Sequence, residues 1–338
     1  MDREQFEGYA VARNGVALFD LSSGTKLALN GSDCSKYLDG LVSFSIESMR
    51  NGQATNTLVL RDDGTLVAIV WLLKDDESFL ILTDPEKRDH LLSWLVDHRT
   101  GFDVDIQDKT DLLACLSIVG PKAQELARSL AGDDIIGLPY LGFEQNNDMD
   151  CLVCRVGYTG EYEYRFIFSK DRLDAMRETI MKKGSDHAVA EYGTSLMDVL
   201  MLEMKSINQI RDIADGVTPL QAGLHWAIDF RKDSFSGREA VINEKSALER
   251  KLLLLVLSNG APPAVEAGLF IGDEKVGHVV NHHFSPTLAK SIALASIRES
   301  VAWVGVEFDV ETEGGGRTRA KAYSSPLFLT KTVTEAVL

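Results

Sequence analysis

The chain has 338 residues, which is enough for two or three domains, each with a core of its own. Its 51 acidic and 35 basic side chains give a formal net charge of -16, and Lys and Arg form no run, which argues against a nucleic-acid partner. The sequence contains no apolar run of membrane-spanning length, and the stretch MDREQFEGYA lacks the order of a signal peptide. Four cysteines make no disulfide framework in a chain this long, so we expect a cytoplasmic protein that does not act at a membrane.

Short strands and amphipathic helices alternate over the first hundred residues. The pattern predicts strands at 16–21, 26–29, 56–61, 66–73 and 79–83, and helices at 33–41 and 85–98. Asp33 can cap the first of these helices, and Asp62-Asp63-Gly64 is typical of a hairpin turn. This part of the chain is expected to be α+β.

The same alternation continues through the middle of the chain. Strands are expected at 112–119, 151–158 and 162–168, and helices at 120–130, 173–183 and 195–205. Beyond residue 250 the pattern changes to short strands at 252–258, 267–271, 276–281, 292–297, 303–310 and 320–323, separated by turn residues. We therefore expect a separate antiparallel β-barrel or sandwich, joined to the rest near the polar stretch 243–246.

Six segments, taken in order, carry a family resemblance. They are Leu18-Phe19-Asp20-Leu21-Ser22, Val119-Gly120-Pro121-Lys122-Ala123, Gly157-Tyr158-Thr159-Gly160-Glu161, TPLQAGLHW at 218–226, DSFSGREA at 233–240 and FSPTLAKSIALA at 284–295. Together they resemble the T-protein (aminomethyltransferase) family of folate-dependent one-carbon transferases. Most of these residues are suited to turns and helix starts, so they indicate a fold more than a reaction.

The resemblance implies a particular architecture and chemistry. The fold would be an α+β ring of three domains around a central channel, with residues 1–23 and 111–218 in the first domain, 24–110 and 219–247 in the second, and a β-barrel at 248–338. The channel would hold tetrahydrofolate, and the enzyme would transfer a methyl or aminomethyl group to or from a small molecule.

Several positions that the resemblance assigns to folate binding or catalysis carry other side chains here. They are Val67 and Ala68 in place of two aspartates, Arg165 in place of a glutamate, Met197 and Ala264 in place of arginines, and Asn56 and Asp84 in place of a tyrosine and an asparagine. Valine cannot move a proton, and each unpaired polar partner in such a pocket costs on the order of 1–3 kcal/mol. The chain is thus identified as a divergent member, for which relatives that demethylate small O- or S-methyl compounds are the better analogy. A lipoyl carrier protein is not an expected partner.

We expect the channel to be lined by ten polar and aromatic candidates. Tyr158 and His282 are the candidates for assisting proton movement. The candidates for cofactor binding are Asn56, Trp71, Glu163, Arg165, Glu203, Lys205, Gln209 and Arg211.

Some of these residues have alternative interpretations. Arg165 either binds an anionic group of a ligand or pairs with Glu161 or Glu163 on the surface of its strand. His282 and His283 are adjacent on a strand, so at most one of them faces the channel, and both are solvated if they lie in a loop. Cys151 and Cys154 lie within one strand, which favours a structural role, and no metal site is expected.

Two functional hypotheses remain open from the sequence. The first is a tetrahydrofolate-dependent one-carbon transferase with an altered donor or acceptor. The second is a repurposed scaffold that uses no folate and binds or converts another small anion through Arg165 and Lys205.

Overall fold

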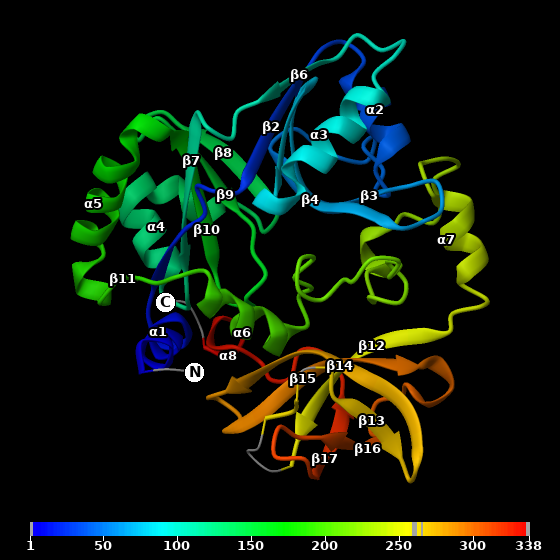
Figure 1. The fold of residues 1–338 in the computed structure, drawn as a ribbon. Coiled ribbons are helices and arrows are strands. Elements are labelled where there is room, and N and C mark those ends of the chain that lie inside the picture. The colour runs from blue at the N-terminus through cyan, green and yellow to red at the C-terminus, as the bar shows by residue number, and fades with distance from the viewer. Residues whose placement is uncertain (1–2, 259–261, 265, 336–338) are drawn as a thin grey trace.

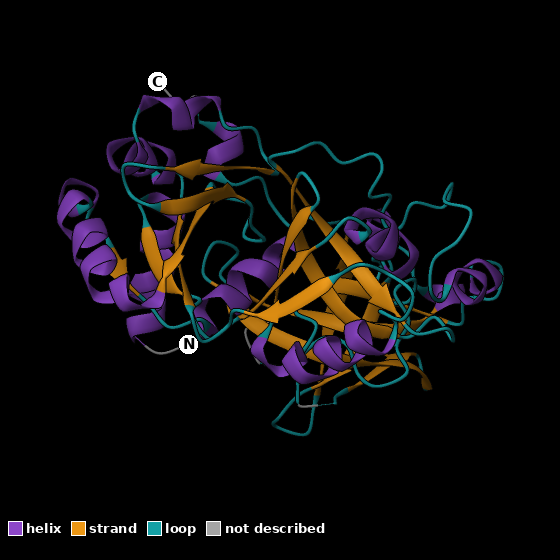
Figure 2. Ribbon diagram, turned by 90° about the horizontal axis from the view of Figure 1, so that it is seen from above, coloured by secondary structure: helices purple, strands orange, loops and turns teal. Residues whose placement is uncertain are grey.

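The computed structural model describes residues 3–258, 262–264 and 266–335. It consists of an 11-stranded sheet with helices around it and a separate closed barrel of six strands (Figure 1). Seen from above, the strands of the sheet form two groups with helices on their outer sides (Figure 2). The α+β class and the C-terminal antiparallel barrel that the sequence predicts are both confirmed.

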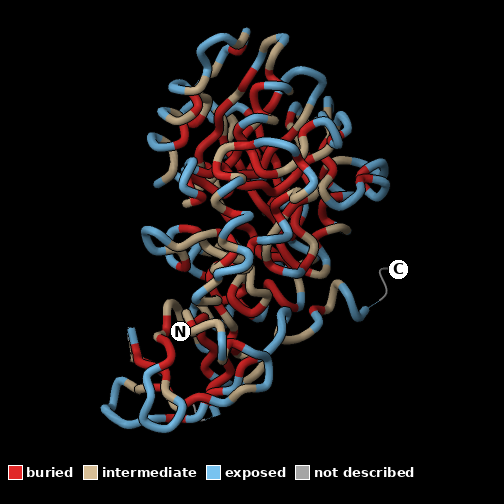
Figure 3. The backbone as a smooth tube through the Cα atoms, turned by 90° about the vertical axis from the view of Figure 1, so that its right-hand side faces the viewer, coloured by how far each residue is buried: buried red, intermediate tan, exposed pale blue. Residues whose placement is uncertain are grey.

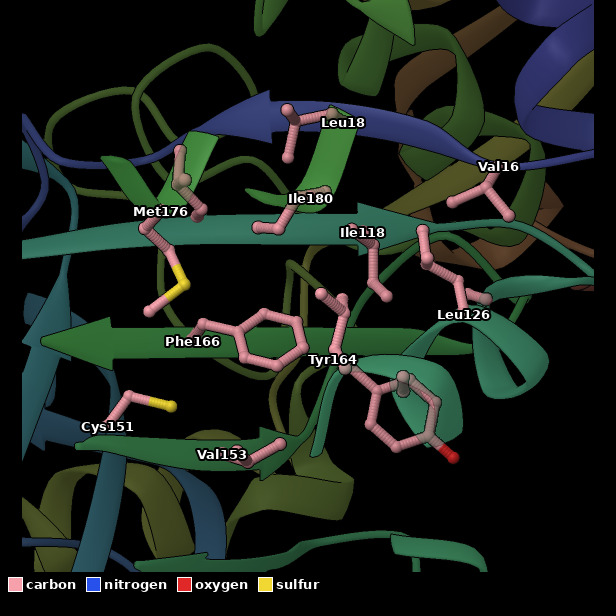
Figure 4. Close-up of a cluster of buried hydrophobic side chains, with 14 of the residues drawn as sticks. Val16, Leu18, Ile118, Leu126, Cys151, Val153, Tyr164, Phe166, Met176 and Ile180 are labelled. Carbon is pink, nitrogen blue, oxygen red and sulfur yellow. The ribbon is translucent and has the colours of Figure 1, made fainter. Parts of the chain in front are cut away.

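The first group of strands packs against two helices. Its strands are β1 (Ala17–Asp20), β7 (Leu113–Val119), β8 (Gly142–Asn146), β9 (Cys151–Arg155), β10 (Glu163–Ser169) and β11 (Ala190–Glu191), and its helices are α4 (Ala123–Ala131) and α5 (Leu173–Lys183). Apolar side chains of these elements form one buried cluster, part of which is shown in Figure 4. β10 contributes Tyr164, Phe166 and Phe168 to this cluster. Side chains alternate along a strand, so Glu163 and Arg165 point to the opposite face.

The second group continues the same sheet. It contains β2 (Thr25–Asn30), β3 (Gln53–Leu60), β4 (Leu66–Asp75), β5 (Ser78–Thr83) and β6 (Asp105–Asp108), with helices α2 (Cys34–Leu41) and α3 (Arg88–Asp97). β3 pairs with β8 at Gln53 and Gly142, which joins the two groups. The boundary between the two α+β domains therefore crosses a continuous sheet, and its exact position stays a prediction.

A bulge in the pairing of β3 with β4 sets the orientation of β4. Val59 pairs with Ala68 while Leu60 pairs with Leu66, so Val67 is the extra residue between these pairs. The side chains of Val67 and Ala68 both pack in the core beneath α2 and α3. Ile69 and Trp71 face the other side of the sheet, where they line a cavity.

The C-terminal barrel has the strand order β12-β15-β14-β13-β16-β17. These strands are β12 (Arg250–Leu257), β13 (Gly268–Ile271), β14 (Glu274–Ser285), β15 (Lys290–Arg298), β16 (Glu307–Glu311) and β17 (Arg317–Tyr323). Buried residues are frequent along the strands of the barrel, as they are along the strands of the sheet (Figure 3). Closing the barrel leaves no exposed strand edge.

The remaining helices connect these parts. They are α1 (Arg3–Asn14), α6 (Ser195–Met204), α7 (Arg238–Glu244) and α8 (Lys331–Thr334). α6 packs against α1 and against β14 and β15 of the barrel. The loop that follows α6 closes one side of the cavity described below.

Candidate functional site

A cavity of about 370 Å³ lies between the two groups of strands and the segment that begins with α6. Its walls come from residues 21–26, from Ile69 and Trp71 in the middle of β4, from the end of β5 with the turn at 84–86, and from residues 194–211. Cys115, Tyr158 and Arg165 complete the lining. The size suits a small-molecule site, in which a few polar groups stand out from apolar walls. These polar groups therefore define what the cavity can bind.

The central charged group of the cavity is Arg165 on β10. Its Nε and Nη2 donate to Oε1 of Glu163 at 2.9 and 2.8 Å. Glu163 also accepts from Ser117 Oγ and from the backbone N–H of Tyr158, both at 3.3 Å. Burial lowers the pKa of Arg165, but the charge of Glu163 outweighs it and raises that pKa above its usual range. Arg165 thus pairs with Glu163, as one of the two interpretations of the sequence expects, but the pair is buried at the cavity and does not lie on the surface.

Two aromatic rings lie beside this pair. The ring centroids of Trp71 and Tyr158 are 5.2 Å apart, and the guanidinium of Arg165 lies 5.9 and 5.6 Å from them. Asn56 Nδ2 donates to Tyr158 Oη at 2.8 Å. Burial raises the pKa of Tyr158 well above its ordinary value, so its hydroxyl stays protonated at neutral pH. Trp71 Nε1 is buried and has no hydrogen-bond partner among the residues that the structure describes.

Gln209 holds the end of β5 and the carboxylate that follows it. Its Oε1 accepts from the N–H of Ile69 at 2.7 Å, and its Nε2 donates to Asp84 Oδ2 at 2.7 Å and to Thr83 Oγ1 at 3.0 Å. In the described part of the chain, Asp84 Oδ1 has no hydrogen-bond donor. Burial raises the pKa of Asp84, although the bond from Gln209 and the charge of Arg165 oppose the shift.

A second carboxylate, Asp198, comes from α6. Its Oδ2 lies 2.8 Å from Arg211 Nη1, and its Oδ1 accepts from Asn208 Nδ2 at 3.0 Å. Burial raises its pKa, Arg211 opposes that shift and Asp84 adds to it. The side chain of Arg211 is 50% exposed, so this pair stands at the rim.

Lys26 and Cys115 complete the polar wall. Lys26 Nζ donates to the backbone oxygens of Ser22 and Gly24 at 2.9 and 2.6 Å. Burial lowers the pKa of Lys26 and raises the pKa of the Cys115 thiol. We therefore expect the buried thiol and the backbone-bonded lysine to shape the cavity wall and not to take part in a reaction.

The structure brings seven of the ten candidates from the sequence together. Those that line the cavity are Trp71, Tyr158, Arg165, Gln209 and Arg211. Asn56 and Glu163 lie directly behind them, bonded to Tyr158 and Arg165.

The other three candidates lie elsewhere. Glu203 is fully buried and accepts hydrogen bonds from Tyr9, Arg13 and Ser285, which ties α1 and β14 to α6. Lys205 ends α6 in a left-handed conformation with φ 57°, outside the cavity wall.

His282 lies on β14 of the barrel, where burial lowers its pKa and Glu313 opposes that shift. Its neighbours Asn281 and His283 are the ones directed toward the loop after α6. Asn281 Nδ2 donates to Asp212 Oδ1 at 2.8 Å, and Arg211 adds to the effect of burial in lowering the pKa of His283 to about 4. The register of β14, which the sequence pattern does not reveal, decides which histidine faces this loop.

The resemblance places Asp84 at a channel position without giving it a role, and nothing in the sequence indicates that Asp198 belongs to the site. Asp84 precedes Pro85 at the start of a helical segment, where an aspartate is usually a cap, and Asp198 lies inside a helix. The positions of Val67 and Met197 were assigned from the resemblance. Of these, Met197 lines the cavity and Val67 lies in the core.

The described ranges hold no group of three or more His, Cys, Asp or Glu side chains placed to bind a metal ion. Cys151 and Cys154 are buried and free, and they pack in different clusters of the core. The helices that the structure describes are all too short or too polar to cross a bilayer.

Comparison with known proteins gives matches along most of the chain. The sequence model of the GCVT N-terminal domain matches residues 5–232, and that of the glycine cleavage T-protein C-terminal barrel domain matches residues 250–328. An aminomethyltransferase of Thermotoga petrophila is 29% identical over 332 residues, covering 96% of this chain and 89% of the relative. An aminomethyltransferase of Alkaliphilus oremlandii is 27% identical over 316 residues, covering 91% of this chain and 86% of the relative.

A solved structure has the same fold. The crystal structure of glycine cleavage system aminomethyltransferase T from Bartonella henselae aligns with a TM-score of 0.89 at 20% sequence identity. The alignment covers 96% of this chain and 90% of that one. At this identity the likeness concerns the fold, and the chemistry has to be argued from the cavity.

Proposed function

The chain belongs to the glycine cleavage T-protein family, and on that basis we propose that it is a tetrahydrofolate-dependent one-carbon transferase. The proposed reaction is of the demethylase type, in which a methyl group leaves a small O- or S-methyl compound. We further propose that it works in the cytoplasm on a free small molecule, without a lipoyl carrier protein.

The observation that carries this proposal is a pair of polar atoms without hydrogen-bond partners at the cavity, beside the rings of Trp71 and Tyr158. Trp71 Nε1 is a buried donor without a partner, and Asp84 Oδ1 is an acceptor without a donor among the residues described. A buried polar atom without a partner costs free energy, so its presence in a cavity wall supports a ligand that completes it. A reduced pterin ring carries both acceptor atoms and N–H groups, so it fits these two residues.

The walls around these atoms also suit a flat heterocycle with an anionic tail. Trp71, Tyr158 and Met197 provide apolar surface, and the half-exposed Arg211 stands at the rim, where a carboxylate would remain partly solvated. When bound, tetrahydrofolate supplies a secondary amine nitrogen as the acceptor of the one-carbon group. Tyr158, which stays protonated, can donate a hydrogen bond to the departing oxygen or sulfur.

The position of Val67 favours demethylation over glycine cleavage. The resemblance assigns a catalytic aspartate to this position, but the residue here is an apolar side chain packed in the core. Positioning and exclusion of water can supply much of the rate of a methyl transfer. His282 has no role in this proposal because it lies outside the cavity.

The alternative of a folate-free anion site is less well supported. Glu163 already neutralises Arg165 at 2.8 Å, and Lys205 does not line the cavity. An added anion would have to compete with a buried carboxylate for the same guanidinium.

Isothermal titration calorimetry with tetrahydrofolate and 5-methyltetrahydrofolate tests the proposal. We expect saturable binding to the wild type and about tenfold weaker binding to Trp71→Phe, because phenylalanine keeps the apolar surface but loses a hydrogen bond worth on the order of 1 kcal/mol. The matched control is Trp226→Phe, since Trp226 is 58% exposed and lies outside the cavity. Equal affinities of the two variants would contradict the assignment of Trp71.

A further inference from the structure

We infer that Asp84 is the proton carrier of this cavity, exchanging a proton between the accepting nitrogen and the group that loses its methyl. This inference rests on the proposed function and adds to it a residue with a defined role.

Three separate elements position Asp84. It follows the last residue of β5, and its backbone is extended, with φ -63° and ψ 148°, ahead of Pro85. Thr25 Oγ1 donates to its backbone oxygen at 3.0 Å, and Gln209 Nε2 donates to its Oδ2 at 2.7 Å. One carboxylate oxygen is thus fixed, and the other accepts no hydrogen bond from the described residues.

The two cavity carboxylates differ in their partners. Asp198 has a cation at 2.8 Å in Arg211 and an amide donor in Asn208, so its ionised form is stabilised. The side chain of Asp84 has only the neutral amide of Gln209 as a hydrogen-bond partner among the described residues. When two carboxylates share one cavity, the one without a cation contact is the one that takes up a proton.

The surroundings of Asp84 shift its pKa in both directions. Burial is the largest influence and raises its pKa, and Glu86 raises it further, while Arg165 and Lys87 lower it. Asp198 faces it from α6 with the same sign of charge. Arg165 is itself committed to Glu163, so it reduces the shift of Asp84 without forming a contact that would hold the carboxylate ionised.

The proposed reaction requires one proton to move. A carbon–oxygen or carbon–sulfur bond breaks and a carbon–nitrogen bond forms, while the secondary amine loses one proton and the leaving oxygen or sulfur gains one. Asp84, protonated once the cavity is occupied, gives its proton to the leaving oxygen or sulfur and then accepts the proton that the methylated nitrogen loses, so atoms and charge balance without a further reactant. A carboxylate that can exist in either protonation state suits this exchange.

Proton-linked calorimetry of the Asp84→Asn variant tests the inference. Tetrahydrofolate is titrated into wild type, Asp84→Asn and the exposed control Asp75→Asn at pH 6 and pH 8, each in two buffers with different ionisation enthalpies. The buffer dependence of the heat gives the number of protons taken up on binding. We expect uptake by the wild type and by Asp75→Asn that increases toward pH 6, because enclosure of the cavity favours protonated Asp84.

The Asp84→Asn variant should still bind, within about a tenfold change in Kd, but without this proton uptake. Asparagine keeps an oxygen that can accept from Gln209, so the turn is retained. Equal proton uptake by Asp84→Asn and wild type, with binding intact, overturns the inference and leaves the proposed function standing. If the wild type binds no tetrahydrofolate, the proposed function fails and the inference fails with it.

Discussion

At the scale of single residues, the cavity depends on buried charges that compensate one another inside the fold. Arg165 and Glu163 are 8% and 1% exposed in their side chains, so each relies on the other for neutralisation. Such a pair adds little net stability, but the loss of one partner leaves an uncompensated buried charge. Arg165 is therefore better described as part of the wall than as a free binding group.

The Glu163→Gln variant should consequently lose about 3–5 kcal/mol of unfolding free energy. Urea unfolding followed by circular dichroism measures the loss. The Glu7→Gln variant is the control, because its ion pair with Arg3 is exposed and is worth less than about 1 kcal/mol. Similar small losses in both variants would show that Arg165 does not depend on Glu163.

Residue identity in the site was only partly predictable from the sequence. We expect five residues in the channel wall that also line the cavity, and their roles stay predictions: Trp71, Tyr158, Arg165, Gln209 and Arg211. Proton carriers are harder to predict because their role depends on partners far away in the chain. Asp84 acquires its environment from Gln209, 125 residues later, and no local pattern encodes that contact.

At the scale of elements, the bulge in β4 decides which side chains reach the cavity. It turns Val67 into the core beneath α2 and α3 and leaves Ile69 and Trp71 on the cavity side. An extra residue in one strand shifts the facing of its neighbours, and hydrophobic alternation alone does not locate such a bulge when nearly every residue of the strand is apolar.

The Val67→Asp variant tests this orientation. We expect it to be destabilised by several kcal/mol, on the order of 3 or more, because an unpaired carboxylate would enter an apolar core. Thermal unfolding measures the loss, and the nearly isosteric Val67→Thr serves as the control for shape. A stable Val67→Asp protein with tighter tetrahydrofolate binding would instead place this side chain in the cavity.

Helices and strands with strong periodicity were predictable, whereas α1 was not expected from the sequence. The sequence of α1 contains Gly8 and many polar residues, and its place in the fold depends on distant contacts. Tyr9 and Arg13 both bond to Glu203, about 190 residues later. That network also explains why Glu203, expected in the channel, lies in the packing between α1 and α6.

At the scale of the whole molecule, one buried carboxylate links the cavity loop to the barrel. Asp212 accepts from the N–H of Asn208 in its own loop at 2.8 Å and from Asn281 of β14 at 2.8 Å. Burial raises the pKa of Asp212 from 3.8 to about 6. The folded protein therefore binds this proton more tightly than the unfolded chain, and stability from this group is lost as the pH rises from about 4 through 6.

The Asp212→Asn variant should be more stable than the wild type at pH 8, by about 1–3 kcal/mol, and this gain should shrink as the pH falls to 5. Asparagine removes the charge, and Asn281 can turn its amide to accept the new N–H. Urea unfolding at both pH values measures the difference, with exposed Asp215→Asn as the control. A gain that grows toward pH 5 would contradict the sign of the shift.

The family resemblance predicted the architecture of the whole molecule because its motifs are spread from residue 18 to residue 295. It could not define the chemistry, since the positions that it assigns to folate differ here and the cavity is assembled from segments far apart in the chain. The central claim is that this altered cavity still binds a reduced pterin.

Titration of tetrahydrofolate into the wild-type protein tests that claim most directly. We expect one site per chain with a Kd on the order of micromolar, and competition by 5-methyltetrahydrofolate for the same site. The absence of any binding heat at high-micromolar protein, in a preparation shown to be folded by circular dichroism, would contradict it.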